Sequence, residues 1–245
     1  MIEAKQEQGS AMPGTPGRWK ELYQVGAIGA LVSEIVILLG IVTFFFWPYA
    51  PGKQSTLTIF TTLHSHPLGG LISLDLFLVI GNLFGILLFL ALYVALRQVN
   101  ESYALIALVF GLIAAVLIIP ARPLMELSAL SKVYATALNA AVQSQTLAAG
   151  EALLALFNGT SWFMNTLLGG ISLLISSLLM LKSKVFNRAT AIVGIITNAA
   201  VCFFFIPGGI GTFLLFLSLP GYLIWYFQLA LRFFQMGREH STDGG

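Results

Sequence analysis

Val25–Trp47 reads VGAIGALVSEIVILLGIVTFFFW, and Leu71–Leu96 reads LISLDLFLVIGNLFGILLFLALYVAL. Each run is long enough to cross about 30 Å of hydrocarbon as a helix. Each also contains one carboxylate, Glu34 in the first run and Asp75 in the second. An ionisable group in hydrocarbon is energetically costly, so such residues usually face a partner or a cavity. The two runs predict a membrane protein and mark two candidate site residues.

The composition supports the same class of protein. Hydrophobic residues make up 58% of the chain and charged residues 9%, whereas soluble domains average about 45–50% and about 25%. A soluble fold could not bury that much apolar surface. The net charge of +2 gives no reason to expect nucleic acid as a partner. Since Cys202 is the sole cysteine, an intrachain disulfide and a Cys-based metal site are excluded.

Six apolar runs predict an all-α, polytopic membrane helix bundle with six transmembrane helices. The runs are Val25–Trp47, Leu71–Leu96, Tyr103–Ile119, Ser161–Leu181, Ala189–Ile206 and Thr212–Leu231. We expect a polar tail at residues 1–24, the membrane domain at 25–232 and a second tail at 233–245.

Basic residues predict the orientation of the bundle. The two tails, the links at 97–102 and 182–188 and Arg232 at the end of the last span lie on one side, and together they contain nine of the twelve Lys and Arg residues. The opposite side has only Lys53, Arg122 and Lys132. Because cytoplasmic segments carry the excess of Lys and Arg, both termini are predicted to be cytoplasmic.

The long outer segment 120–160 is not a plain linker. Pro123–Val142 and Thr146–Phe157 are rich in Ala and Leu, which predicts two helices. Arg122 and Glu126 are four residues apart, the spacing at which helix neighbours can pair. We expect these helices to lie on the outer membrane face as interfacial helices that cap the bundle.

The polar residues of the predicted spans can be grouped by their distance from the ends of those spans. At about 1.5 Å per residue, Glu34 and Asn198 lie about 14 Å from the inner ends of their spans. Asn82 and Ser172 lie about 17 Å below the outer ends of theirs, and Asp75 lies about 8 Å below the outer boundary. The sequence therefore predicts a polar layer near the bilayer midplane, with Asp75 above it.

Residue spacing predicts that both carboxylates face inward. Gly26, Ala30 and Glu34 recur every four residues, so Glu34 shares a stripe with small side chains that allow close helix contact. Asp75 and Asn82 are seven residues apart, which returns to nearly the same side of a helix. The polar layer could be hydrogen-bonding glue between spans, or it could line a cavity for a ligand or a proton path. The candidate ligand-binding residues are Asp75, Asn82, Glu34, Asn198, Arg122 and Glu126.

Catalytic and metal motifs are not evident. No His falls inside a predicted span, and neither HExxH nor GxSxG occurs. His64 and His66 could supply two metal ligands with Asp75 or Glu126, but loop histidines are usually solvated. We expect no catalytic residue, no metal and no cofactor.

The block Ala91–Ala104 reads ALYVALRQVNESYA. It resembles the hinge between the second and third spans of the DUF4386 family, in which Leu-Tyr and a basic residue precede Val-Asn. The basic link before the fifth span and the proline in the last span are also similar, and the resemblance extends over about residues 20–235. It implies a six-span bacterial or archaeal membrane protein, hence a plasma membrane location, and supplies no activity.

Three functions remain open at this stage. One is a non-enzymatic bundle that binds or transports a small molecule or lipid through an outward-opening cavity, motivated by the polar layer. A second is an accessory or structural subunit of a larger membrane complex, motivated by the missing catalytic motifs. A third is an intramembrane lipid-modifying enzyme, which the lack of an intramembrane His disfavours.

Overall fold

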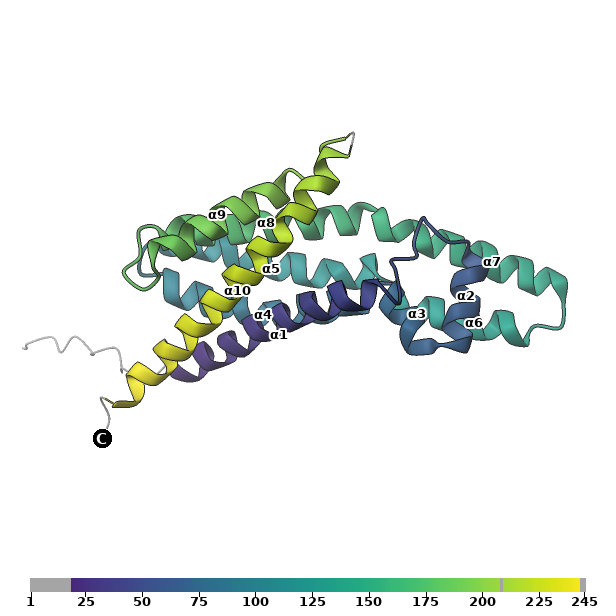
Figure 1. The fold of residues 1–245 in the computed structure, drawn as a ribbon, viewed down its shortest axis with the longest axis horizontal. Helices are drawn as coiled ribbons and strands as arrows, with labels where there is room; N and C mark the ends of the chain where they lie inside the picture. The colour runs from purple at the N-terminus through teal and green to yellow at the C-terminus, as the bar shows by residue number, and fades with distance from the viewer. Residues whose placement is uncertain (1–18, 208, 243–245) are drawn as a thin grey trace, which may run out of the picture.

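The computed structural model describes residues 19–207 and 209–242, and every regular element within them is a helix (Figure 1). Long helices alternate in direction along the longest axis of the molecule and form a bundle. They are α1 (Lys20–Phe44), α4 (Leu76–Leu96), α5 (Glu101–Ala121), α8 (Thr160–Met180), α9 (Arg188–Cys202) and α10 (Ile210–Thr242). The shorter helices are α2 (Thr56–Ser65), α3 (Pro67–Ser73), α6 (Leu124–Thr136), α7 (Ala140–Ala155) and the 3-10 turn η1 (Leu156–Asn158).

The described residues contain five helical stretches that are long and apolar enough to cross a membrane. They include α1, α4, α5, α8 and α10, so the prediction of an all-helical, multi-pass membrane protein is confirmed. The remaining bundle helix, α9, is apolar but has only 15 residues. At about 1.5 Å per residue it is about 22 Å long, which is shorter than the hydrocarbon core.

Small residues bring α1 and α4 together. Gly26 of α1 lies directly against Ala91 of α4, so a side chain at position 26 would overlap the Ala91 Cβ atom. A Cβ atom at Gly29 would lie 2.9 Å from the backbone oxygen of Phe84. Ala30 is fully buried on the same face. The predicted small-residue stripe is thus an α1–α4 contact, as close backbone packing in membranes requires.

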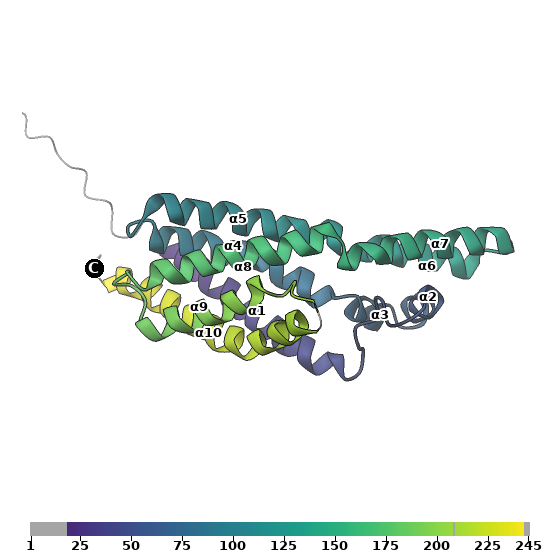
Figure 2. The same cartoon turned by 90° about the horizontal axis from the view of Figure 1, so that it is seen from above.

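The short helices form a separate outer unit, which we call the head: residues 50–73 with α2 and α3, and residues 124–158 with α6, α7 and η1. Figures 1 and 2 show the head projecting beyond one end of the bundle along its long axis. It has its own apolar core, in which Ile59, Phe60, Leu127 and Phe157 are buried. The bundle core is separate and includes Leu92, Trp225, Leu229 and Phe233.

The outer helices are not arranged as the sequence predicted for interfacial helices that cap the bundle. Helices α6 and α7 do not lie across the end of the bundle; they form a hairpin that continues outward, with α6 beyond α5 and α7 beyond α8 (Figure 2). The physical reason is that both helices bury Leu127, Leu147 and other apolar side chains against α2 inside the head. They therefore have an apolar partner other than a membrane surface.

The start of the second membrane helix was also predicted wrongly. Leu71–Ser73 belongs to α3, and α4 begins only at Leu76. Between them Asp75 has a left-handed backbone with φ 69°, a conformation that ends one helix and turns the chain into the next. Asp75 consequently precedes the helix that contains Asn82, so their seven-residue spacing does not place them on one helical face.

The final helix is longer than its apolar run. α10 extends from Ile210 to Thr242, and Phe233 and Met236 are buried in the bundle core. The segment expected as a tail from residue 233 thus begins inside a packed helix. The N-terminal tail is expected at residues 1–24, and residues 1–18 of it lie outside the described part of the chain.

Candidate ligand-binding site

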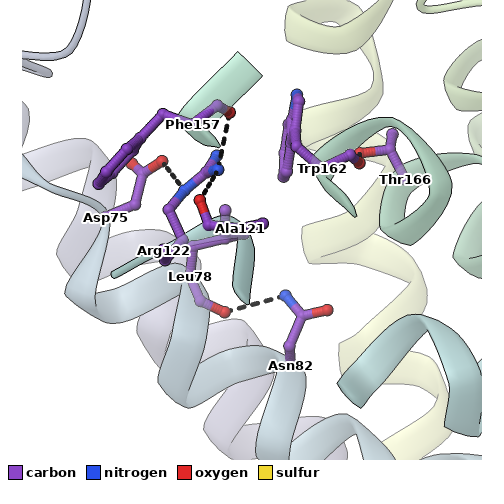
Figure 3. Close-up of polar contacts among 8 residues, drawn as sticks. All are labelled: Asp75, Leu78, Asn82, Ala121, Arg122, Phe157, Trp162 and Thr166. Atoms are coloured by element: carbon purple, nitrogen blue, oxygen red, sulfur yellow. Dashed lines mark hydrogen bonds and ion pairs between the residues drawn. The ribbon is translucent and has the colours of Figure 1, made fainter. Parts of the chain in front are cut away.

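An ion pair lies at the junction between the bundle and the head. Nε of Arg122 donates a hydrogen bond to Oδ2 of Asp75 at 2.9 Å (Figure 3). Nη1 of the same guanidinium donates to the carbonyl oxygens of Ala121 at 3.0 Å and Phe157 at 2.8 Å. Asp75 stands just before α4, Arg122 just after α5, and Phe157 in the turn before α8. One side chain therefore fixes three membrane helices at the point where they leave the bundle.

The two partners differ in exposure. The side chain of Arg122 is 2% exposed and that of Asp75 is 27% exposed. Figure 3 shows the guanidinium enclosed by two aromatic rings, with Cζ 5.0 Å from the ring centroid of Phe157 and 4.3 Å from that of Trp162. Such cation–π contacts stabilise a desolvated cation. Arg122 is therefore a fixed structural group, while Asp75 is the member of the pair that a ligand can reach.

Burial governs the titration of the groups around this pair. Burial raises the pKa of Asp75 above its ordinary value, and the charge and hydrogen bond of Arg122 oppose the rise. Burial also raises the pKa of Tyr49 to about 12, with a further contribution from Asp75. The Tyr49 hydroxyl therefore stays protonated at neutral pH and remains a hydrogen-bond donor close to the Asp75 carboxyl.

The expected pairing of Arg122 with Glu126 is replaced by the Arg122–Asp75 pair. Glu126 lies exposed on α6, whereas the Arg122 side chain turns back toward α4. The reason is that Arg122 ends α5 with φ −134° and ψ 76°. It is not part of the helix that contains Glu126, so the four-residue helical spacing does not apply.

Deeper in the bundle, amides bridge neighbouring helices. Nδ2 of Asn165 lies 2.9 Å from Oδ1 of Asn82 and 2.7 Å from the carbonyl oxygen of Ala114, and it donates to both. This links α8 to α4 and α5. Sequence reasoning missed Asn165, although a lone amide within an apolar run was a usable signal for it.

Two further polar bridges cross other helix pairs. The hydroxyl of Tyr222 on α10 donates to Oδ1 of Asn198 on α9 at 2.9 Å, and Ser172 on α8 donates to the carbonyl oxygen of Ala107 on α5. Asn198 also donates to the carbonyl oxygen of Gly194. The predicted polar layer is thus a set of separate hydrogen-bonded bridges, a structure consistent with its role as glue between helices.

A cavity of about 290 Å³ lies in the middle of the bundle. Its wall is mostly apolar, including Val36, Phe89 and Leu173, with polar groups from Asn82 and Asn165. The amides that bridge the helices therefore also line an internal space.

A larger groove of about 530 Å³ opens beside this cavity, between α1, α4 and α10. Figure 1 shows the reason: α10 crosses α1 near the end opposite the head and diverges from it toward the head. The crossing is marked by the stacked rings of Tyr23 and Phe233, with centroids 6.0 Å apart. The groove wall is apolar along its length, and Tyr49 and Asp75 line it at the end nearest the head. Cavity and groove share four wall residues: Val36, Ile37, Leu78 and Leu219.

The structure brings some of the predicted site residues together and leaves others apart. Asp75 and Arg122 form the ion pair, and Asn82 lines the adjoining cavity. Glu34 is half-buried on α1, lines neither space, and has no hydrogen bond or ion pair with any described residue. Asn198 is held by Tyr222.

The two histidines considered as metal ligands lie at the surface of the head. Both are exposed, and the ring of His66 packs against Trp47 with centroids 5.5 Å apart. Over the described part of the chain, no group of three His, Cys, Asp or Glu residues is positioned to hold a metal ion.

The sequence model of the family described as "Domain of unknown function (DUF4386)" matches residues 22–234. The chain belongs to the DUF4386 family. This confirms the resemblance that the Ala91–Ala104 hinge indicated over about residues 20–235 of the DUF4386 chain. Comparison with curated proteins and with solved structures gives no match. The family description assigns no activity.

Proposed function

We propose that this DUF4386 chain is a non-enzymatic membrane protein that binds an amphiphile, a lipid or lipid-like molecule, as a binding or transport protein. The observation that carries the proposal is the apolar groove of about 530 Å³ that is lined at its head-side end by the Asp75 carboxylate. Ligand sites in proteins are typically about 300–1,000 Å³, mostly apolar, with few polar groups that orient the ligand. Both spaces fall at or close to this size range.

The ion pair suggests which head group fits. Arg122 occupies Oδ2 of Asp75, and Oδ1 accepts no hydrogen bond from the described residues. Because the guanidinium already balances the carboxylate charge, the free oxygen favours a head group with an N–H or O–H donor over a bare cation. The chain of the ligand would follow the apolar wall of α1 and α10, and the shared wall at Val36 and Leu78 offers a passage toward the central cavity.

The proposal includes a membrane topology. We propose that α9 also crosses the membrane, because it packs along α8 and α10 in the bundle. The start of α1, the end of α10 and the α4–α5 and α8–α9 turns lie at one end (Figure 1). Arg97, Lys182 and Lys184 lie in these turns, which supports a cytoplasmic placement of that end in a prokaryotic plasma membrane and an external head.

Filling the groove tests the proposal directly. A Cβ atom at Gly40 would have open space around it, and Gly40 lines the groove, so Gly40→Phe fills the groove without displacing the backbone. We expect this variant to lose binding of a fluorescent single-chain primary-ammonium amphiphile while its unfolding temperature is retained. Leu39→Phe is the matched control, since Leu39 is exposed on the same helix outside the groove.

Asp75→Asn tests the head-group contact separately. It keeps the side-chain shape but removes the charge, so the probe should bind about tenfold more weakly, as expected when a charge-assisted hydrogen bond is lost. Unchanged probe affinity in Gly40→Phe would refute the groove as the site. Unchanged affinity in Asp75→Asn alone would refute the assigned head-group contact.

A second candidate function is a subunit of a larger membrane assembly. Its supporting observation is the tip of the α6–α7 hairpin, where Leu138 is fully exposed and Val133 and Val142 are also exposed. Cross-linking from position 138 in native membranes, followed by mass measurement, would capture such a subunit. Recovery of the uncross-linked monomer alone would argue against it.

A further inference from the structure

A third cavity, of about 430 Å³, lies at the end of the bundle opposite the head. It is bounded by the connection between α8 and α9, the first turn of α9 and residues 228–235 of α10. Figure 1 shows this connection at the same end as the C-terminal end of α10. Unlike the groove beside α1, it is lined largely by basic, amide and hydroxyl groups: Lys184, Asn187, Thr190, Gln228, Arg232 and Gln235.

Two basic side chains line this cavity. Lys184 comes from the α8–α9 connection and is exposed, while Arg232 comes from α10. Nε of Arg232 donates to the carbonyl oxygen of Val185 at 2.6 Å, and Nη1 donates to Oε1 of Gln235 at 3.2 Å. These contacts fix the guanidinium beside the connection. No acidic residue is among the described residues that line the cavity.

The start of α9 adds positive potential at the same place. Oδ1 of Asn187 accepts a hydrogen bond from the backbone N–H of Thr190 at 2.7 Å, so the helix begins at the cavity wall. The first backbone N–H groups of a helix have no partners within the helix, and together with the helix dipole they favour an anion.

Gln228 adds an amide group to the wall of the cavity. Oε1 of Gln228 is buried and has no hydrogen-bond partner among the described residues. The two ends of a Gln amide are nearly indistinguishable in shape, so either its oxygen or its NH₂ group can face the cavity. The amide of Gln228 therefore offers a hydrogen-bond donor or acceptor at the cavity wall.

We propose that this cavity binds a phosphate group, held between Lys184, Arg232 and the first turn of α9. Basic pockets between transmembrane helices at the cytoplasmic side bind phospholipid head groups, and a free phosphate anion has the same chemistry. The site is independent of the groove beside α1 and lies at the other end of the bundle.

The test compares two lysines of the same connection. Lys184 lines the cavity and Lys182 does not, although both are exposed. Lys184→Gln and Lys182→Gln change the net charge identically, so general attraction to an anionic surface affects both variants equally. The full-length protein is placed in nanodiscs of phosphatidylcholine with a titrated fraction of phosphatidylglycerol, and separately titrated with inorganic phosphate in detergent. Binding is measured from the shift in unfolding temperature.

We expect the wild type to be stabilised by at least one of the two probes, and Lys184→Gln to need about fivefold more of it, the effect of one basic contact. Lys182→Gln should behave as the wild type. Stabilisation by phosphatidylglycerol alone identifies a lipid head group as the ligand, and stabilisation by inorganic phosphate identifies a soluble anion. Equal responses of the two variants, or no response of the wild type to either probe, would overturn the proposal.

Discussion

The bundle and the head bury apolar side chains in opposite ways. The head packs large side chains such as Phe60, Leu127 and Phe157 into one core between short helices, as a soluble domain does. The bundle instead brings helices together through Gly26, Gly29 and other small residues and leaves large side chains such as Val116, Ile196 and Phe216 exposed on its outer surface. The comparison shows that the outer surface of the bundle suits lipid as its solvent, because exposed apolar surface is costly in water but not in hydrocarbon.

The largest expected effect follows from emptying the core of the head. Phe60 is 1% exposed, and Phe60→Ala should destabilise the head by about 4 kcal/mol, as usual for removal of a buried aromatic ring. Because the bundle core is separate, hydrogen exchange should accelerate in α2, α6 and α7 and remain slow in α1 and α4. Uniform acceleration through the whole chain would mean that the two cores unfold as one unit.

The ion pair at the junction of the two units gives the next effect. Arg122→Met leaves the Asp75 carboxylate without its partner and removes the contacts to Ala121 and Phe157. We expect a loss of about 3 kcal/mol in the free energy of unfolding, toward the lower end for a broken buried pair because Asp75 is partly exposed. Equilibrium unfolding in detergent measures it. Asp75→Asn in the Arg122→Met background should recover part of the loss, whereas Glu126→Gln should recover none.

A smaller effect is expected inside the bundle. Gly26→Val places a side chain against Ala91 and forces α1 away from α4, at a cost of about 2 kcal/mol for overpacking. Thermal unfolding of the bundle should shift downward while hydrogen exchange in the head stays unchanged. Gly40→Val is the control, since a side chain at position 40 has open space; equal destabilisation by both would show that helix contact at Gly26 is not the cause.

The class of the protein could be predicted from sequence because the signal is local. The apolar runs predicted the five described helices that are long and apolar enough to cross a membrane, and the hinge at Ala91–Ala104 indicated the family. Gly26 and Ala30 marked a genuine helix contact, although the same stripe did not place Glu34 in the site.

The junction between the two units could not be predicted, because its contacts are long-range or conformational. Arg122 pairs with a residue 47 positions away, and no helical spacing indicates such a contact. The left-handed backbone of Asp75 also could not be predicted from an apolar run, since glycine is the only residue type whose presence reliably indicates a positive φ. Asp75 and Arg122 are nevertheless both among the candidate residues predicted from the sequence, Asp75 as a carboxylate within an apolar run and Arg122 for its spacing to Glu126.

The left-handed backbone at Asp75 also restricts what can replace it. Besides glycine, only Asp and Asn adopt that conformation readily, so position 75 must satisfy the direction of the chain and the chemistry of the site at once. Asn preserves the turn while removing the charge, and Gly preserves the turn while removing the side chain. A Glu, though chemically closest, would strain the start of α4. For protein engineering, the site can therefore be neutralised or emptied at this position, but its carboxylate has no interchangeable substitute.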